Sequence, residues 1–495
     1  MNRALASLLL LLAFTASAKD LVGVYEDATH NDPQVRAADA NRLAQRELRP
    51  QAWAALLPHL TGSASWTKDK QDGTESSLLF NPSLIPPVNL PLSTDSTAKR
   101  WGLNLQQSIF SWSNLMTLQE SANQVAQAEA TYQAAQQSLI LRVSQAYFNV
   151  LSAQDNLDAQ QASLEAIARQ LDQANKRFDV GLIAITDVEE AKAARDTAAA
   201  QVIAAKRTLA TTNDQLGEIT GQKYDALSKP GDHMPLNNPE PASEDKWVQV
   251  SLDQNLTLVS SRLAADIARD NVKVAFGGHL PEISLTASRV RTNTDETESL
   301  GGPSVAFPTT LTDKQYAFQI SVPIFSGGLT QSRVRQAQYS WIAAKETVVQ
   351  NSRATERQAR DAYLGVISGI ARVQALRQAL ESSQTALKAT EAGYEVGTRT
   401  AVDVLNARRQ LVQAQTEYAL SRYDYILSII QLRLAAGTLN RNDLVEVGQW
   451  LDVNEATTPA APLAPAPTTG TTAPAAPGTT PPPATTPTSP QPRAN

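Results

Sequence analysis

The sequence predicts a mainly α-helical protein with a small β part, built as a tandem repeat of long coiled-coil helical hairpins plus four amphipathic strands. The first observation is a duplicated motif: RFDVGLIAITDV at Arg177–Val188 reappears as GYEVGTRTAVDV at Gly393–Val404, 216 positions later. Long helical patterns run into and out of each copy, so both copies are tips of helical hairpins. The second observation is composition, because aromatic residues make up only 5% of the chain and cysteine is absent. This profile is typical of long helices rather than of a compact enzyme.

The first eighteen residues predict a signal peptide. Arg3 precedes the apolar run Leu8–Phe14, and Ala16–Ala18 fits a small-residue cleavage site. Export is favoured over a short buried helix. Without cysteine, we expect neither disulfides nor a lipid-bearing Cys. No later apolar run reaches the roughly 18 residues of a spanning helix, so a membrane span would have to consist of strands.

Apolar residues recur every seven positions along the helices that lead into the tips. In the first copy this seam runs through Val150, Leu157, Leu164, Leu171 and Phe178. In the second copy it runs through Val366, Val373, Leu380, Leu387 and Tyr394. Heptad spacing of this kind predicts coiled coils. At about 1.5 Å per residue, a helix over 113–179 spans roughly 100 Å, so two shorter helices stacked end to end must pack beside it.

Two short stretches alternate between apolar and polar residues, which predicts strands with one wet face. They run through Leu60–Trp66 and Trp101–Ile109, and the second half repeats them. Between each pair of strands the sequence is rich in Asp, Ser, Thr, Pro and Gly. We therefore expect long loops over 68–99 and 292–313.

The expected organisation follows the repeat. In chain order it comprises a signal peptide at 1–18; a first structural repeat at 19–230, with helices at 20–50, 113–179 and 186–220 and strands at about 57–68 and 99–111; a second structural repeat at 231–445, with helices at about 243–278, 328–395 and 402–437 and strands at about 280–292 and 313–325; the end of an equatorial region at 446–455; and a disordered Pro/Thr/Ala-rich tail at 456–495. Asn31–Pro33 predicts a break in the first helix, and Pro50 its end. The tail lacks the apolar side chains that would offset ordering entropy.

Four strands are too few to close a membrane barrel, since single-chain barrels begin at about eight strands. Several chains must then share one barrel, unless the strands form a small soluble sheet that caps a coiled coil. Trp66 and Trp101 suit an aromatic belt at a membrane interface, which favours the shared barrel.

Over about residues 20–444 the chain resembles the TolC family of outer-membrane efflux proteins. The resemblance rests on both tip motifs and on three shorter segments, QSIFSW at Gln107–Trp112, GHLP at Gly278–Pro281 and PIFSGG at Pro323–Gly328. It implies a homotrimer with a twelve-strand outer-membrane β-barrel and a twelve-helix periplasmic α-barrel, in a Gram-negative bacterium. The implied function is a passive exit duct of tripartite efflux or type I secretion systems. The implied partners are outer-membrane lipid, a periplasmic adaptor and an inner-membrane RND, ABC or MFS transporter.

The resemblance also implies a periplasmic gate, formed by Thr186 and Asp187 on the first tip and Tyr394 and Arg399 on the second. Contacts between an arginine, a carboxylate and an aromatic hydroxyl hold one packing of helices, yet a partner can break them. Asp187 and Asp403 each precede a restarting apolar heptad, so helix N-capping is the alternative or additional role of both carboxylates.

Further positions follow from the same resemblance. Gly181 and Gly397 are the expected tip turns. Asp403 matches the first of two acidic rings that bind cations at the family's entrance, whereas Asn406 stands at the second ring position. We therefore expect weaker block by multivalent cations.

No catalytic, cofactor or metal site is expected, and the chain is not expected to be an enzyme. The four histidines are scattered, and without cysteine they form no credible zinc set. The segment Gly217–Lys223 has the wrong glycine spacing for a phosphate-binding loop. Basic residues are dispersed and the net charge is -6, which gives no reason to expect nucleic-acid binding. The competing hypothesis is a soluble periplasmic coiled-coil scaffold or adaptor.

Overall fold

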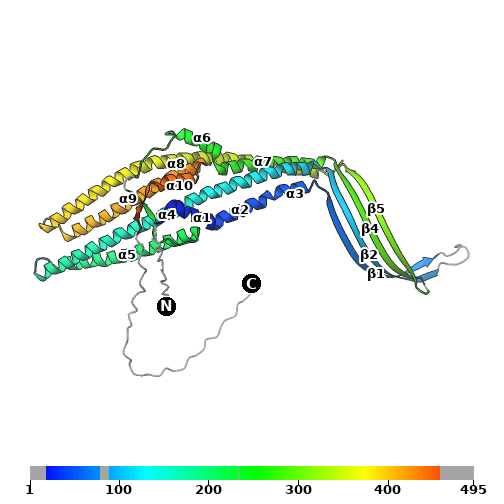
Figure 1. Ribbon diagram of the computed structural model, residues 1–495, viewed down its shortest axis with the longest axis horizontal. Coiled ribbons are helices and arrows are strands. Elements are labelled where there is room, and N and C mark those ends of the chain that lie inside the picture. The colour runs from blue at the N-terminus through cyan, green and yellow to red at the C-terminus, as the bar shows by residue number, and fades with distance from the viewer. Residues whose placement is uncertain (1–17, 78–87, 232–233, 301, 458–495) are drawn as a thin grey trace, which may run out of the picture. The chain divides into compact units, whose positions relative to one another are not determined.

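The computed structural model describes residues 18–77, 88–231, 234–300 and 302–457. The expected signal peptide, except for Ala18, and nearly all of the expected tail lie outside the described residues. The described chain is mostly helical with one small sheet, which confirms the predicted fold class (Figure 1).

In the first repeat, three short helices and the longer helix α5 lie along the long helix α4. Its helices are α1 Leu21–Asn31, α2 Pro33–Arg46, α3 Leu48–Ala54, α4 Trp112–Asp179 and α5 Ile185–Thr220. Asp32 separates α1 from α2, because its carboxylate accepts a hydrogen bond from the Val35 N–H and two from Arg142 of α4. The expectation that Pro50 ends the helix is wrong, since Pro50 lies in the first turn of α3. An N–H has no intrahelical acceptor there, so its absence costs nothing.

The second repeat has the same layout around α8. Its helices are α6 Glu244–Gln254, α7 Leu256–Phe276, a short 3-10 helix at Gly277–His279, α8 Leu329–Glu395, α9 Ala401–Ala436 and α10 Arg441–Gly448. The single helix expected over 243–278 is divided at Asn255, whose side chain accepts from the Leu258 N–H and caps α7. Asn255 therefore takes the place of Asp32. Leu256 stands where Pro33 stands, so no proline marks this break.

One antiparallel sheet continues from the helices, with strand order β1-β2-β4-β5 (Figure 1). The strands are β1 His59–Ser77, β2 Val88–Phe110, β4 Glu282–Leu300 and β5 Val305–Ser321. The loops expected over 68–99 and 292–313 are wrong, because paired strands run through most of both ranges. Backbone hydrogen bonding holds these strands regardless of their polar composition. Within this sheet β1 and β5 each have a neighbour on one side only.

A belt region midway along the helices fixes the two repeats together. Its strands β3 Ser228–Pro230 and β6 Leu451–Ala456 pair with each other. Lys229 forms an ion pair with Asp155 of α4 at 2.8 Å, and the Tyr423 hydroxyl of α9 donates to the same carboxylate at 2.5 Å. The buried Tyr147 hydroxyl donates to the Ser228 carbonyl at 2.7 Å. Burial raises the pKa of the Tyr423 hydroxyl, and Asp155 beside it raises it further.

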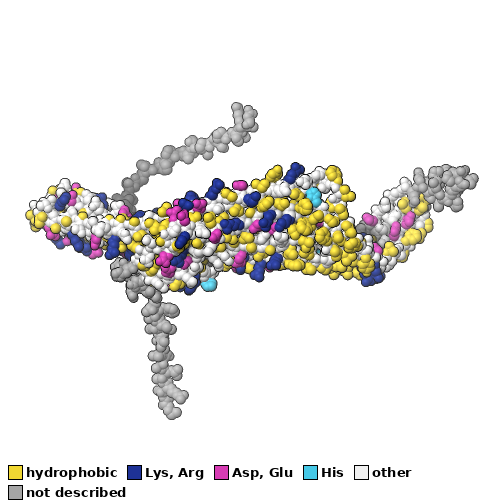
Figure 2. All heavy atoms as spheres, turned by 90° about the horizontal axis from the view of Figure 1, so that it is seen from above, with side chains coloured by type: hydrophobic (Ala, Val, Ile, Leu, Met, Phe, Trp, Pro, Cys, Tyr) yellow, Lys and Arg dark blue, Asp and Glu magenta, His cyan; other side chains and the backbone are white. Residues whose placement is uncertain are grey.

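In the described part of the chain, no helix carries an apolar stretch long enough to cross a bilayer. Large apolar side chains are nevertheless exposed on the sheet and at its junction with the helices, where they gather in Figure 2. They include Leu60, Trp66, Trp101, Leu103, Ile109, Tyr316, Phe318, Ile320, Ile324 and Phe325. A contiguous exposed apolar surface marks a place that another apolar phase or chain covers.

Candidate functional site

Both hairpin tips turn on a glycine in the left-handed region. Gly181 has a φ of 76° and Gly397 a φ of 80°. At the first tip the Leu182 N–H donates to the Arg177 carbonyl at 2.9 Å, which closes the end of α4. At the second tip the Thr398 N–H donates to the Gly393 carbonyl at 2.8 Å. This is how a glycine-terminated helix satisfies its last carbonyls, and residues with a Cβ are strained at such a φ.

The two tips differ in how the next helix begins. Thr400 caps α9, its hydroxyl accepts from the Asp403 N–H at 3.2 Å, and the Asp403 carboxylate accepts from the Thr400 N–H at 2.9 Å. This reciprocal pair is a capping box. At the first tip the capping residue is Ala184, and no side chain caps α5. The predicted capping role is therefore confirmed for Asp403 in a modified form, since it accepts from a backbone N–H as the third residue of α9 while Thr400 is the cap. The role is wrong for Asp187, which lies in the first turn of α5 without such a bond.

The capping box changes the electrostatics of the predicted first acidic ring. Hydrogen bonds from the Thr400 N–H and hydroxyl, with Arg399 nearby, hold the pKa of the Asp403 carboxyl below its ordinary value. One turn further along α9, the Asn406 side-chain oxygen accepts from the Arg409 guanidinium at 2.5 Å. The position predicted for the second ring thus carries an amide with a cation beside it, a feature that Asn406 alone did not reveal.

The predicted gate residues occupy both tips without forming a latch within one chain. Thr186 is exposed and Asp187 half-buried on the first turn of α5, while Tyr394 lies in the last turn of α8. The Arg399 stem packs against Gly393, where an added Cβ would lie 2.8 Å from the Arg399 Cγ. In the described hydrogen bonds, none joins the Thr186 or Asp187 side chain to the second tip.

Sequence reasoning missed the contact that does join the tips. The Arg177 guanidinium lies over the Tyr394 ring, 5.3 Å from its centroid. Both side chains are half-buried, so this cation–π contact is shielded in part from water. The heptad pattern placed each residue at the end of its own helix, but only the packing of one hairpin against the other brings them together.

A second missed contact lies just behind the second tip. Arg408 of α9 donates to Glu391 of α8 at 2.5 Å, and the Arg408 side chain is 19% exposed. A half-buried ion pair of this kind fixes the spacing between α8 and α9. Residues 391 and 408 face each other across the turn, so their opposite charges were the signal that could have revealed the pair.

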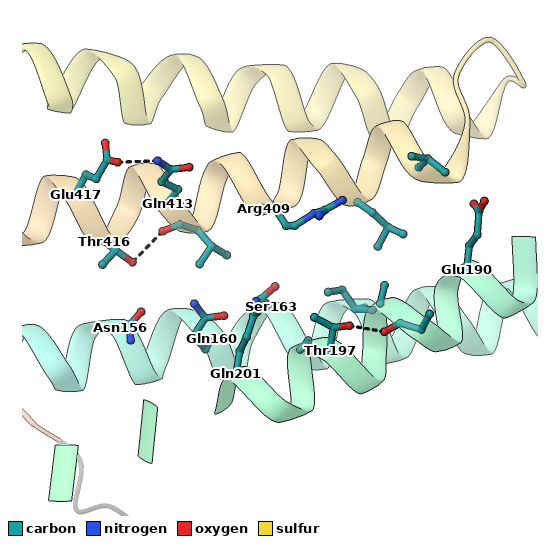
Figure 3. Close-up of a pocket in the computed structure, with 17 residues that line it drawn as sticks. Asn156, Gln160, Ser163, Glu190, Thr197, Gln201, Arg409, Gln413, Thr416 and Glu417 are labelled. Carbon is teal, nitrogen blue, oxygen red and sulfur yellow. Dashed lines mark hydrogen bonds between the residues drawn. The ribbon is translucent and has the colours of Figure 1, made fainter. Parts of the chain in front are cut away.

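A groove lies between the two hairpins, on the side of the tips that faces the rest of the helices (Figure 3). Its cavity is about 780 Å³, and its floor includes the small apolar cluster of Ile167, Ala198 and Leu405. Polar side chains line the walls. They come from α4, α5 and α9 and include Gln160, Ser163, Thr197, Gln201, Arg409 and Gln413. The lining thus combines apolar side chains with amides, hydroxyls and the charged groups of Glu190, Arg409 and Glu417.

Within residues 18–77, 88–231, 234–300 and 302–457, no three His, Cys, Asp or Glu side chains are grouped so as to hold a metal ion. The tips and the groove thus offer hydrogen bonds, charges and apolar contacts. These are the means of holding or releasing a packing of helices.

Comparison with known proteins identifies the family. The family model for outer membrane efflux proteins matches residues 24–222 and 247–438. The chain belongs to the outer membrane efflux protein family. Among its relatives, the outer membrane protein TolC of Vibrio cholerae is 35% identical over 438 residues, covering 88% of this chain and 94% of the relative. TolC of Escherichia coli K12 is 36% identical over 453 residues, covering 90% and 87%.

Other family members and solved structures agree with this assignment. The alkaline protease secretion protein AprF of Pseudomonas aeruginosa is 29% identical over 438 residues and 88% of each chain. The crystal structure of the Campylobacter jejuni CmeC outer membrane channel has a TM-score of 0.67 at 20% identity, over 88% of this chain and 90% of that one. At this identity the structural match establishes the shared fold of the family.

Proposed function

We propose that this chain is the outer-membrane exit duct of a tripartite efflux or type I secretion system of a Gram-negative bacterium, a passive channel without enzymatic activity. The observation that carries the proposal is the small sheet, whose two edge strands are open and whose exposed side chains include many large apolar residues. An open apolar sheet is stable in lipid only when its edges are closed by other strands. Membership of the efflux family and the TolC and AprF relatives support the same reading.

In this proposal three copies assemble into one pore. Each copy contributes β1, β2, β4 and β5 to a twelve-strand barrel in the outer membrane, and its two hairpins to a twelve-helix barrel in the periplasm. The chain itself supplies the closure at the tips. Thr186 and Asp187 of one tip meet Tyr394 and Arg399 of a tip in a neighbouring copy, while Arg177 holds Tyr394 within each copy.

Opening requires a partner that separates the tips. The groove between α4, α5 and α9 is the proposed docking place of a helical hairpin of a periplasmic adaptor, because apolar side chains such as Ile167, Val402 and Leu405 line it and can receive the apolar face of a helix. An inner-membrane RND, ABC or MFS transporter supplies the energy, and outer-membrane lipid surrounds the sheet.

Planar-bilayer conductance of the purified protein tests the duct and its gate. We expect a small current for the wild type and a larger one for Arg399→Ser and Asp187→Ala, because each removes a charged contact between tips. Glu165→Gln, an exposed change on α4, is the matched control and should leave the current unchanged. A protein that is extracted without detergent and carries no current would be the soluble scaffold or adaptor instead.

A further inference from the structure

The two repeats are equivalent in their contacts as well as in their sequence. A shift of 216 positions takes α4 to α8, and a shift of 223 takes α2 and α3 to α7. Asn114 of α4 donates to the Ala55 carbonyl at 3.3 Å. Their equivalents Thr330 and Gly278 are also neighbours, since a Cβ added at Gly278 would lie 2.9 Å from the Thr330 Cγ2. A contact between two positions in one repeat therefore indicates that the equivalent positions meet in the other.

Where α7 of the second repeat packs on α4 of the first, the contact centres on one buried carboxylate. Asp270 of α7 is 0% exposed and accepts from two amides of α4, Asn123 at 2.7 Å and Gln119 at 3.4 Å. Lys273 of its own helix completes the set at 2.7 Å. Two donors on the long helix thus hold a carboxylate on the short helix beside it.

The equivalent positions lie on two surfaces that no element of the described part of the chain covers. The shift takes Asp270 to Glu47, Gln119 to Arg335 and Asn123 to Tyr339. All three equivalents are exposed, with Tyr339 at 69%. The types of hydrogen-bonding group are the same at these positions, because the long helix again carries two donors and the short helix again carries a carboxylate. One donor is now a guanidinium, which forms stronger hydrogen bonds with a carboxylate than an amide does.

We infer that Glu47 of one copy is bound by Arg335 and Tyr339 of the adjacent copy. The partner is therefore a second copy of this chain, and the inference rests on the side-by-side assembly of the proposed function. The face of α8 and the face of α2 and α3 form a head-to-tail interface, which closes when it repeats around a ring. The contact between copies thus has the same form as the contact at Asp270 within one copy. The difference is that the cation beside Glu47 comes from Arg335 of the adjacent copy.

Two features beside these residues support the pairing. Pro50 stands where Lys273 stands, so the position that supplies a cation to Asp270 supplies none to Glu47. Arg335 of the other copy provides the missing charge. Apolar side chains flank the site on both faces, where Leu43 is 46% and Ile342 47% exposed, and an interface between copies covers them.

Cross-linking in the full-length protein tests this contact, since the chain has no cysteine of its own. The double variant Glu47→Cys with Arg335→Cys is treated in detergent with a short bifunctional maleimide. We expect denaturing gels to show covalent bands larger than one chain. The matched control, Gln119→Cys with Asp270→Cys, joins the equivalent contact within one chain and should consume its thiols while staying at monomer mass.

Charge reversal provides a second readout. Glu47→Arg and Arg335→Glu alone should each reduce the oligomer that survives mild denaturant, and the double reversal should restore it. If the Glu47→Cys, Arg335→Cys variant gave only bands of monomer mass while the protein remained oligomeric and conducting, the proposed contact would be wrong. The proposed duct would stand. A monomer without conductance would instead contradict the proposed function.

Discussion

Buried carboxylates in this protein are stabilised in different ways, and the difference has consequences for pH. Asp32 is held by the Arg142 guanidinium, and Asp270 by Lys273 and amides. Glu120, beside Asp270, accepts from the amides of Gln124 and Asn271, with no cationic partner among the described residues. Burial raises the pKa of the Glu120 carboxyl above its ordinary value, hydrogen bonds from these amides lower it in part, and the nearby Asp270 raises it.

Replacing Glu120 by Gln should raise the thermal midpoint at pH 7. A carboxyl with a raised folded pKa stabilises the fold fully below its unfolded pKa of about 4.5, and this contribution is lost as the pH rises through the folded pKa. The difference between variant and wild type should therefore vanish toward pH 4. Thermal unfolding in detergent from pH 4 to pH 8 measures it.

Glu165→Gln is the control for this measurement, because Glu165 is exposed at 72% and pairs only with Arg169 on its own helix. It should shift the midpoint little at any pH. A Glu120→Gln midpoint below that of the wild type at pH 7 would show that the charged form stabilises the fold.

At the scale of helices and strands, small differences between the repeats decide local structure. Thr400 gives α9 a capping box, and Ala184 leaves α5 without one. Residues Asp187 and Asp403 are equivalent by sequence, so the capping residue three positions earlier is what separates them. Three hydrogen bonds between Thr400 and Asp403 therefore hold the first turn of α9, and α5 has no side-chain cap.

Exchanging these capping residues should exchange the behaviour of the two helix starts. Thr400→Ala should speed amide hydrogen exchange in the first turn of α9, and Ala184→Thr should slow it in the first turn of α5, since each changes one capping side chain. Exchange measured by mass spectrometry on tip peptides reports both. Equal exchange rates at the two wild-type tips would contradict this reading.

The repeats made most helices predictable, and the exceptions have physical causes. The heptad seams and the duplicated tips indicated α4, α5, α8 and α9. The outer halves of the strands were missed because their Thr, Ser and Asp residues are typical of loops. The backbone hydrogen bonds that stabilise these strands do not depend on side-chain type, so composition does not reveal them. The Arg177–Tyr394 contact was missed because it depends on how one hairpin packs on the other.

At the scale of the whole molecule, charge at the entrance of the proposed pore is set by a few positions repeated in every copy. The pKa of the Asp403 carboxyl is lowered by hydrogen bonds from Thr400, so its charged form is favoured. Asn406 is neutral, and Arg409 donates to it. The field at this constriction is therefore less negative than two carboxylates per copy would make it.

Asn406→Asp should tighten block by a trivalent cation by roughly tenfold, because each copy then adds a carboxylate at the constriction. Arg409→Gln should act in the same direction by removing the adjacent cation. Single-channel recordings with increasing concentrations of a trivalent hexaammine complex measure the blocking concentration. Unchanged block in both variants would mean that these residues lie away from the ion path.

The two open strand edges also set the order of events in assembly. Contact between the repeats, such as that at Asp270, forms inside one chain, so its rate is independent of concentration. In the proposed assembly, contact between copies is bimolecular, and its rate falls as the protein is diluted. Until copies meet, β1 and β5 expose unpaired backbone groups that other strands can bind. Pairing with wrong strands therefore competes with correct assembly during the time that a chain waits for another copy. Slow synthesis keeps the concentration of copies low and so lengthens this time.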